Sequence, residues 1–243
     1  MRRSLGHPRA ALRGEESGTR PTRRHWWRWI AGGAVLLVVL AVAATGAVVE
    51  LTPGPAPLTL PKGAAAPSGP LDGTWQVAAG SVAGFRVRET VIGFSNDVTG
   101  RTGDVAGTMV VAGSGVSQAT FLVDLAAISA DGKTRQPQFM RSLGVTAHPD
   151  ATVTLARPFT LPAAFSSGAV ITRTAAAMLT VNGAVRPVTV TLSARRDGTT
   201  IEAAGSLPVA FADFHIAGPA GYGFLGSLAS RGTAEFFLIL RLR

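Results

Sequence analysis

Apolar residues recur at every second position in several runs of residues 71–243. In the run SVAGFRVRE, Phe85 and Val87 alternate with two arginines, and the runs 188–193 and 233–243 alternate in the same manner. A spacing of two places apolar side chains on one face of a β-strand and polar side chains on the other. The pattern therefore predicts an all-β domain over this region.

Turn residues divide the domain into eight or so expected strands. Asn182-Gly183 and Asp197-Gly198 are dipeptides that tight β-hairpins favour. Besides the three alternating runs, strands are expected at residues 73–78, 106–111, 119–125, 151–156, 170–181 and 200–207. One short helix is expected over Lys133–Leu143. Such a series is typical of an antiparallel barrel or a sandwich, and periodicity alone leaves that choice open.

An uncharged apolar run precedes this domain at residues 30–49. As a helix it would reach about 30 Å, the thickness of the hydrocarbon core of a bilayer. Residues 1–29 contain eight arginines and two glutamates, and positively charged flanks stay in the cytoplasm. We expect a single signal-anchor helix in a bacterial-type cell membrane, with a cytoplasmic N-terminus and an extracytoplasmic β-domain. The alternative is a cleaved signal peptide, whose apolar region is usually shorter.

The charge distribution argues against nucleic acid as a partner. The formal net charge is +9, but residues 70–243 carry 14 basic and 11 acidic side chains, so most of the excess lies in the basic tail. Residues 50–70 are rich in Pro, Gly and Ala and read as a linker between the membrane helix and the domain at residues 71–243. The absence of cysteine excludes disulfides and a lipidated cysteine.

Residues that carry chemistry are sparse in the domain. His148 and His215 have no neighbours at metal-ligand spacing, and no G-x-S-x-G nucleophile motif is present. We therefore expect no enzyme, no metal and no cofactor. Apolar and aromatic residues are plentiful instead, and an apolar cavity is where a lipid-like molecule binds. Strand alternation and the set of aromatic residues together select as candidate ligand-binding residues Phe85, Val87, Phe121, Phe139, Leu179, Val181, Phe211 and Phe214.

The domain opens with GTWQV and continues with SVAGFRVR. The segment MLTVNGAVRPVTVTL lies at residues 178–192, and FADFHI follows at residues 211–216. In this order the segments resemble the YceI-like family of lipocalin-like polyisoprenoid-binding domains. The first two are similar to the opening strands of that family, and residues 178–192 are close to one of its hairpins. The resemblance extends over almost all of residues 71–243.

The resemblance implies an antiparallel eight-stranded lipocalin-like barrel around a tunnel for an isoprenoid chain, in an extracytoplasmic protein. We accordingly expect a membrane-tethered binding or carrier protein for a polyisoprenoid, such as an isoprenoid quinone, or another lipid-like ligand. One alternative is a structural or protein-interaction domain with a solid core and no ligand. Another is an enzyme acting on a bound quinone, for which polar groups such as Asp213 and His215 would converge inside the cavity.

Overall fold

The structure, a computed structural model, describes residues 55–91, 94–130, 143–217 and 226–243. Within these ranges no helix is long and apolar enough to cross a bilayer. The expected membrane helix at residues 30–49 lies outside the described residues, and so does the expected helix over Lys133–Leu143 except for its last residue.

The described residues form thirteen strands, all antiparallel and all in one sheet. The strands are β1 (Gly73–Val77), β2 (Val82–Val91), β3 (Phe94–Thr102), β4 (Val105–Ala112), β5 (Gly115–Asp124), β6 (Ser129–Ala130), β7 (Asp150–Leu155), β8 (Phe159–Thr160), β9 (Ile171–Val181), β10 (Ala184–Asp197), β11 (Thr200–Ala210), β12 (Gly226–Leu228) and β13 (Arg231–Leu242). Two short helical turns accompany them, α3 (Ala163–Ser166) and the 3₁₀ helix η1 (Phe211–Phe214). The sequence did not predict either turn.

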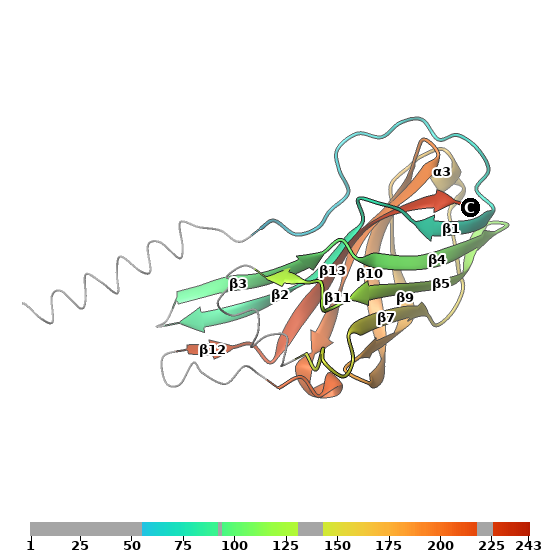
Figure 1. Cartoon of the computed structure of the whole chain (residues 1–243). Helices are drawn as coiled ribbons and strands as arrows, with labels where there is room; N and C mark the ends of the chain where they lie inside the picture. The colour runs from blue at the N-terminus through green and yellow to red at the C-terminus, as the bar shows by residue number, and fades with distance from the viewer. Residues whose placement is uncertain (1–54, 92–93, 131–142, 218–225) are drawn as a thin grey trace, which may run out of the picture. The chain divides into compact units, whose positions relative to one another are not determined.

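Eight strands close into a ring in the order β1-β4-β5-β7-β9-β10-β11-β13, with β13 pairing back onto β1 (Figure 1). The expected antiparallel eight-stranded barrel is therefore confirmed, and the sandwich alternative is wrong. The long hairpin of β9 and β10 turns at Asn182-Gly183, where both residues have positive φ, as a two-residue hairpin turn requires.

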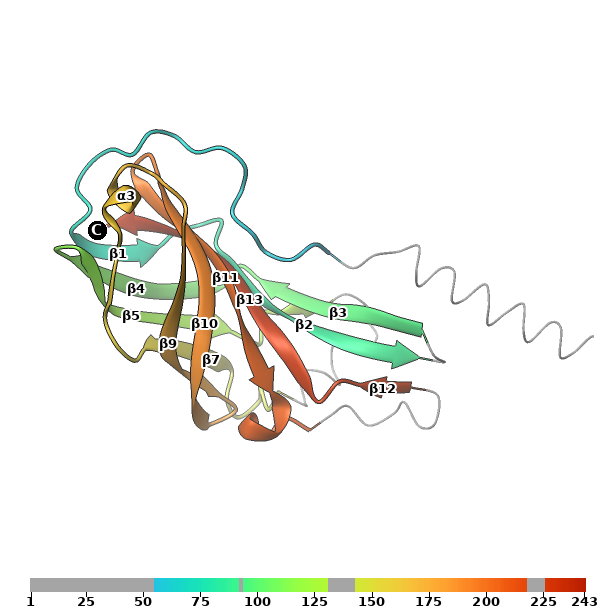
Figure 2. The same ribbon diagram turned by 180° about the vertical axis from the view of Figure 1, so that it is seen from behind.

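Strand β13 is shared between the ring and a lateral extension of the sheet. Its C-terminal part pairs with β1, and residues 233–237 pair with β2, which continues to β3 and β6. The Ser81 hydroxyl, between β1 and β2, connects this part of the chain to β13. It donates to the Ala78 carbonyl at 2.8 Å and accepts from the Ile239 N–H at 3.0 Å. Seen from behind, β2 and β3 extend beyond the ring (Figure 2).

The apolar interior consists of two clusters, one toward each end of the ring. One contains Trp75, Phe165 and Leu240, and the other contains Leu179 and Phe214. Several inward-pointing side chains of the strands are only half-buried, although the ring surrounds them. Side chains that fill a core completely would be buried, so this exposure indicates a hollow interior.

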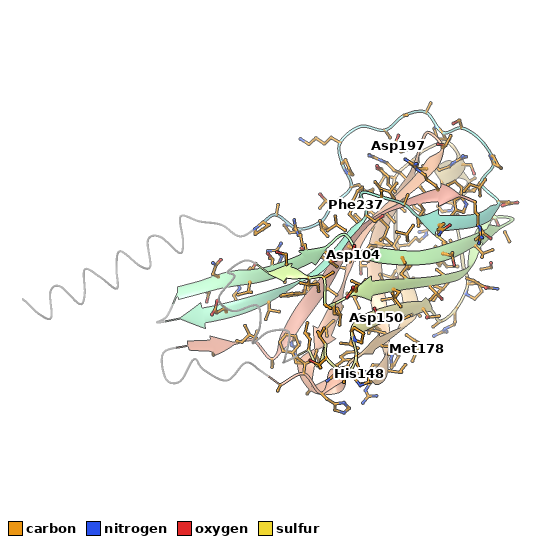
Figure 3. The ribbon with its side chains drawn as sticks, viewed as in Figure 1. Asp104, His148, Asp150, Met178, Asp197 and Phe237 are labelled. Atoms are coloured by element: carbon orange, nitrogen blue, oxygen red, sulfur yellow. The ribbon has the colours of Figure 1, made fainter. Side chains whose placement is uncertain are left out.

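Residues 55–69, which we call the strap, run along the outside of the barrel without helix or strand (Figure 1). At one end the guanidinium groups of Arg86 and Arg101 donate to the carbonyls of Pro55 and Ala56. The other end lies on the β10–β11 turn, where Asp197 is labelled in Figure 3. There the Ala65 N–H donates to the Asp197 carboxylate at 2.6 Å. The described part of the expected linker is thus fixed to the domain at both ends.

Candidate functional site

The barrel encloses a cavity of about 240 Å³ that extends through both apolar clusters. Among the described residues that line it, only Thr233 and Glu235 have polar side chains. Strand alternation places both Thr233 and Glu235 on the opposite face from Phe236, outside the ring. There the Glu235 carboxylate lies 3.1 Å from Arg101 and 3.5 Å from Arg86. The lumen itself is therefore apolar, as a site for a hydrocarbon chain requires.

Helix α3 closes one end of the cavity. Pro162 stands in extended conformation before the helix, and the Phe165 N–H donates to its carbonyl at 2.9 Å, which makes a single tight turn. The turn directs Phe165 inward, where the side chain is 1% exposed and lies in the same cluster as Trp75. Both side chains are too well buried for a ligand to enter at this end.

The opposite end of the cavity, at η1, reaches the surface. Phe211 and Ile216 line the cavity there and are half-buried, and the lining residue Ala217 is exposed. Asn182 fixes η1 to the β9–β10 turn, since its amide donates to the carbonyls of Phe214 and His215 at 3.2 and 3.3 Å. A long apolar molecule would therefore enter beside η1 and extend toward α3.

The structure places most of the candidate residues around this cavity. Phe214 is 1% exposed and packs in the core cluster beneath η1, but it does not line the cavity. Phe139 lies outside the described residues. The others line the cavity: Phe85, Val87, Phe121, Leu179, Val181 and Phe211. Contact of any of these side chains with a ligand stays a prediction.

Sequence reasoning missed the small residues that give the cavity its room. Ala175, Ala177 and Ala203 line the lumen, where larger side chains would fill an eight-stranded barrel. The alternation in residues 171–181 indicates that Ala175 and Ala177 face the lumen, because they share a face with Leu179 and Val181. Alanine is common on both faces of a strand, so its presence alone does not distinguish a position in the lumen.

Four aromatic rings of the lining lie over glycines. A β-carbon added at any of these glycines would lie within 3.3 Å of a carbon of the paired ring. Each ring therefore lies along the wall, where the glycine leaves space for it. The pairs are Phe85 over Gly100, Phe121 over Gly107, Phe236 over Gly205 and Phe211 over Gly232.

The polar residues considered for chemistry lie elsewhere. Asp213 and His215 are exposed at η1, and neither lines the cavity. His148 is exposed at the same end of the barrel (Figure 3). Within the described ranges, no three His, Cys, Asp or Glu side chains come together in a group that could hold a metal ion.

A closed eight-stranded antiparallel ring around an apolar lumen defines a lipocalin-like barrel. A model of the YceI-like domain matches residues 75–232. The chain therefore belongs to the YceI-like family, and the resemblance found in its sequence is confirmed.

Two solved structures have the same fold. One is a polyisoprenoid-binding domain from Saccharophagus degradans implicated in plant cell wall breakdown, with a TM-score of 0.55 and 16% identity over 71% of this chain and 99% of that chain. The other is BcnA of Burkholderia cenocepacia, with a TM-score of 0.51 and 19% identity over 67% of this chain and 98% of that chain. No curated protein matches the chain in sequence.

Proposed function

We propose that this protein is a membrane-tethered, extracytoplasmic binding or carrier protein for a polyisoprenoid or a similar lipid-like molecule. The observation that carries the proposal is the apolar cavity, which extends through both core clusters and reaches the surface beside η1. Membership of the YceI-like family and the fold shared with a polyisoprenoid-binding domain support it.

The energetics favour a long apolar ligand. Each methylene-sized group withdrawn from water contributes about 0.8 kcal/mol, so an isoprene unit of five carbons contributes about 4 kcal/mol. Association costs roughly 4–15 kcal/mol in lost freedom of motion. About one to four buried isoprene units therefore offset that cost without a single polar contact. A short apolar molecule would bind weakly in the same lumen.

The sequence and the strap both support a membrane tether. A membrane helix at residues 30–49 would leave only residues 50–54 between the bilayer and the first strap contact, at Pro55. Five extended residues span at most about 18 Å. The barrel would then stay beside the bilayer that supplies its ligand. The segment from residue 50 to residue 70 is longer, but its part from Pro55 onward is bound to the domain and adds nothing to the length of the tether.

Native mass spectrometry of the full chain, released from detergent micelles after expression in a bacterial host, tests the binding function. We expect a co-purifying isoprenoid at near-unit stoichiometry, identified by lipid extraction. Neighbouring alanines of β9 supply a matched pair of variants, because Ala177 lines the lumen and Ala176 lies on the outer face. Ala177→Phe fills the lumen and should abolish the bound mass, whereas Ala176→Phe should retain it.

Two outcomes would contradict the proposal. One is a wild-type chain that stays in its apo form when prenyl alcohols and quinones are offered, which would favour an interaction domain without a ligand. The other is a bound lipid that persists in Ala177→Phe when circular dichroism shows both variants folded, because that lipid would lie outside the barrel.

A further inference from the structure

The width of the lumen depends on where the aromatic rings of its wall lie. An eight-stranded barrel is only just wide enough for its own inward side chains. Phenylalanines standing upright from the wall would occupy much of that space. Each ring that lies over a glycine leaves the middle of the barrel open instead.

The four glycines are not equivalent. A β-carbon at Gly107 would also collide with the Thr120 carbonyl, and one at Gly205 with the Thr191 carbonyl. At Gly232 the Arg86 carbonyl lies 3.0 Å away. These three glycines permit close approach of backbone as well as of rings, so their effects on the lumen and on the fold cannot be separated.

Gly100 of β3 differs because only side chains lie in the way. A β-carbon there would meet the Phe85 ring, whose Cζ is 2.6 Å away, and Ile128 Cγ2 at 2.8 Å. Gly100 is directly opposite Phe85 in the β2–β3 register, and its φ is not in the left-handed region. Alanine at this position is therefore compatible with the strand, and the groups that it displaces are two side chains, the Phe85 ring and the Ile128 methyl group.

The displaced ring has no equivalent place along the wall. Its cross-strand neighbour on the other side is Ala234 of β13, which has a β-carbon and itself lines the cavity. With a β-carbon on both cross-strand neighbours, the Phe85 ring is crowded from both sides, and we expect it to stand further into the lumen than it does over Gly100. A single methyl group at Gly100 thus narrows the cavity by up to the thickness of an aromatic ring.

We propose that the Gly100–Phe85 pair is the specificity determinant of this barrel and sets the thickness of the chain that the lumen admits. With Gly100 present, the lumen takes a methyl-branched isoprenoid chain; with the ring displaced, it takes only an unbranched alkyl chain. This inference rests on the proposed function, since it concerns which lipid-like chain is bound.

Competition between two probes in one sample tests the pair. The full chain in detergent micelles is offered equal amounts of farnesol, a methyl-branched alcohol, and dodecanol, an unbranched alcohol with the same main-chain length. Native mass spectrometry gives the ratio of the two bound forms, and comparison between variants cancels partition of the probes into micelles. We expect Gly100→Ala to shift the ratio about tenfold toward dodecanol, because burial of the methyl branches is lost.

Three further variants complete the experiment. Phe85→Ala removes a ring of the lining, so it should bind less of both alcohols without a shift toward dodecanol. The double variant of Phe85→Ala with Gly100→Ala should likewise show no shift, because no ring remains to be displaced. Gly103→Ala is the matched control, because the nearest atom to its added β-carbon is the Ser81 carbonyl oxygen at 3.8 Å. An unchanged ratio in Gly100→Ala, or a shift that Phe85→Ala fails to reverse, would overturn the inference.

The proposed function and the inference fail in different ways. A wild-type chain that binds neither probe and also stays in its apo form with longer prenyl alcohols and quinones removes the function, and a crystal structure of Gly100→Ala then decides the inference. A ring of Phe85 standing in a narrowed lumen supports the pair as the determinant of lumen width. A ring that remains against the wall with the lumen unchanged overturns it.

Discussion

Arg195 and Glu202 face each other across β10 and β11 on the outer face of the barrel. The Arg195 Nη2 lies 2.7 Å from Glu202 Oε2, and Nε donates to the same oxygen at 3.1 Å. Their side chains are only 7% and 10% exposed. Desolvation of two charges costs several kcal/mol, so the pair contributes little net stability, but either charge left alone is strongly unfavourable.

Glu202→Gln should therefore lower the free energy of unfolding by about 3 kcal/mol, since it leaves the Arg195 charge buried without its carboxylate. Urea unfolding followed by circular dichroism measures the change. The double variant Arg195→Met with Glu202→Leu serves as the control and should return to within about 1 kcal/mol of wild type. A single variant as stable as wild type would show that water reaches the pair.

At the scale of single residues, the sequence predicts which side chains face the lumen as long as they lie in strands. Phe85, Val87 and Phe121 lie in strands, whose geometry fixes the direction of their side chains, so alternation and the set of aromatic residues identify them. Phe214 lies in a 3₁₀ helix, where a spacing of two has no such meaning, and it packs beneath η1 instead. The partnership of Gly100 with Phe85 depends on register between strands, which no single strand reveals.

At the scale of elements, long alternating strands are predictable and irregular ones are not. The expected strand at residues 73–78 differs by one residue from β1, and the expected strand at 151–156 differs by one residue at each end from β7. Strand β3, with the sequence FSNDVTGRT, has no apolar alternation, and for this reason it was not predicted. Its place comes from pairing with β2 on one side and β6 on the other.

The strap is an element that composition alone describes as a linker. The Ala65 carbonyl accepts a hydrogen bond from the Gly198 N–H at 3.3 Å, and the Ser68 N–H donates to the Gly198 carbonyl at 2.9 Å. Arg196 adds two hydrogen bonds to the carbonyls of Ser68 and Gly69. These partners come from the β10–β11 turn, more than a hundred residues along the chain, so no local pattern predicts the contact.

Asp197→Ala removes the carboxylate that accepts from the Ala65 N–H. We expect the Ala65 amide to exchange with solvent about five- to tenfold faster, because a hydrogen bond of this kind contributes about 1 kcal/mol. Hydrogen exchange observed by NMR gives the rate. Asp213→Ala, a change at the exposed surface of η1, should leave Ala65 protected. Equal protection in both variants would mean that the remaining strap contacts hold the segment without Asp197.

At the scale of the whole molecule, the barrel depends on contact between the two ends of the domain. Trp75 pairs with Leu242 and Val77 with Leu240, so β1 and β13 close the ring across almost the whole domain. Each strand was predictable by itself, but the closure was not. Periodicity is compatible with a sandwich, and the family resemblance alone favoured the barrel.

A disulfide across this closure should stabilise the whole fold. Gln76 and Arg241 are exposed and directly opposite each other, and the chain contains no cysteine that would compete. Gln76→Cys with Arg241→Cys should raise the melting temperature, with an upper limit of about 5 kcal/mol for a loop of this length. Reduction of the same variant is the control and should return the melting temperature to near that of wild type. Equal melting temperatures for the oxidised and the reduced variant would show that β1 separates from β13 before the barrel unfolds.

The pairing of β1 with β13 also determines when, during synthesis of the chain, the lumen can first be enclosed. A ribosome completes β13 after all the other strands, so the nascent chain has no enclosed lumen until that strand is available. A chain that crosses a membrane as an extended polymer would therefore carry no cargo during its passage. Under the proposed topology, each molecule starts empty and takes up its first ligand only after export.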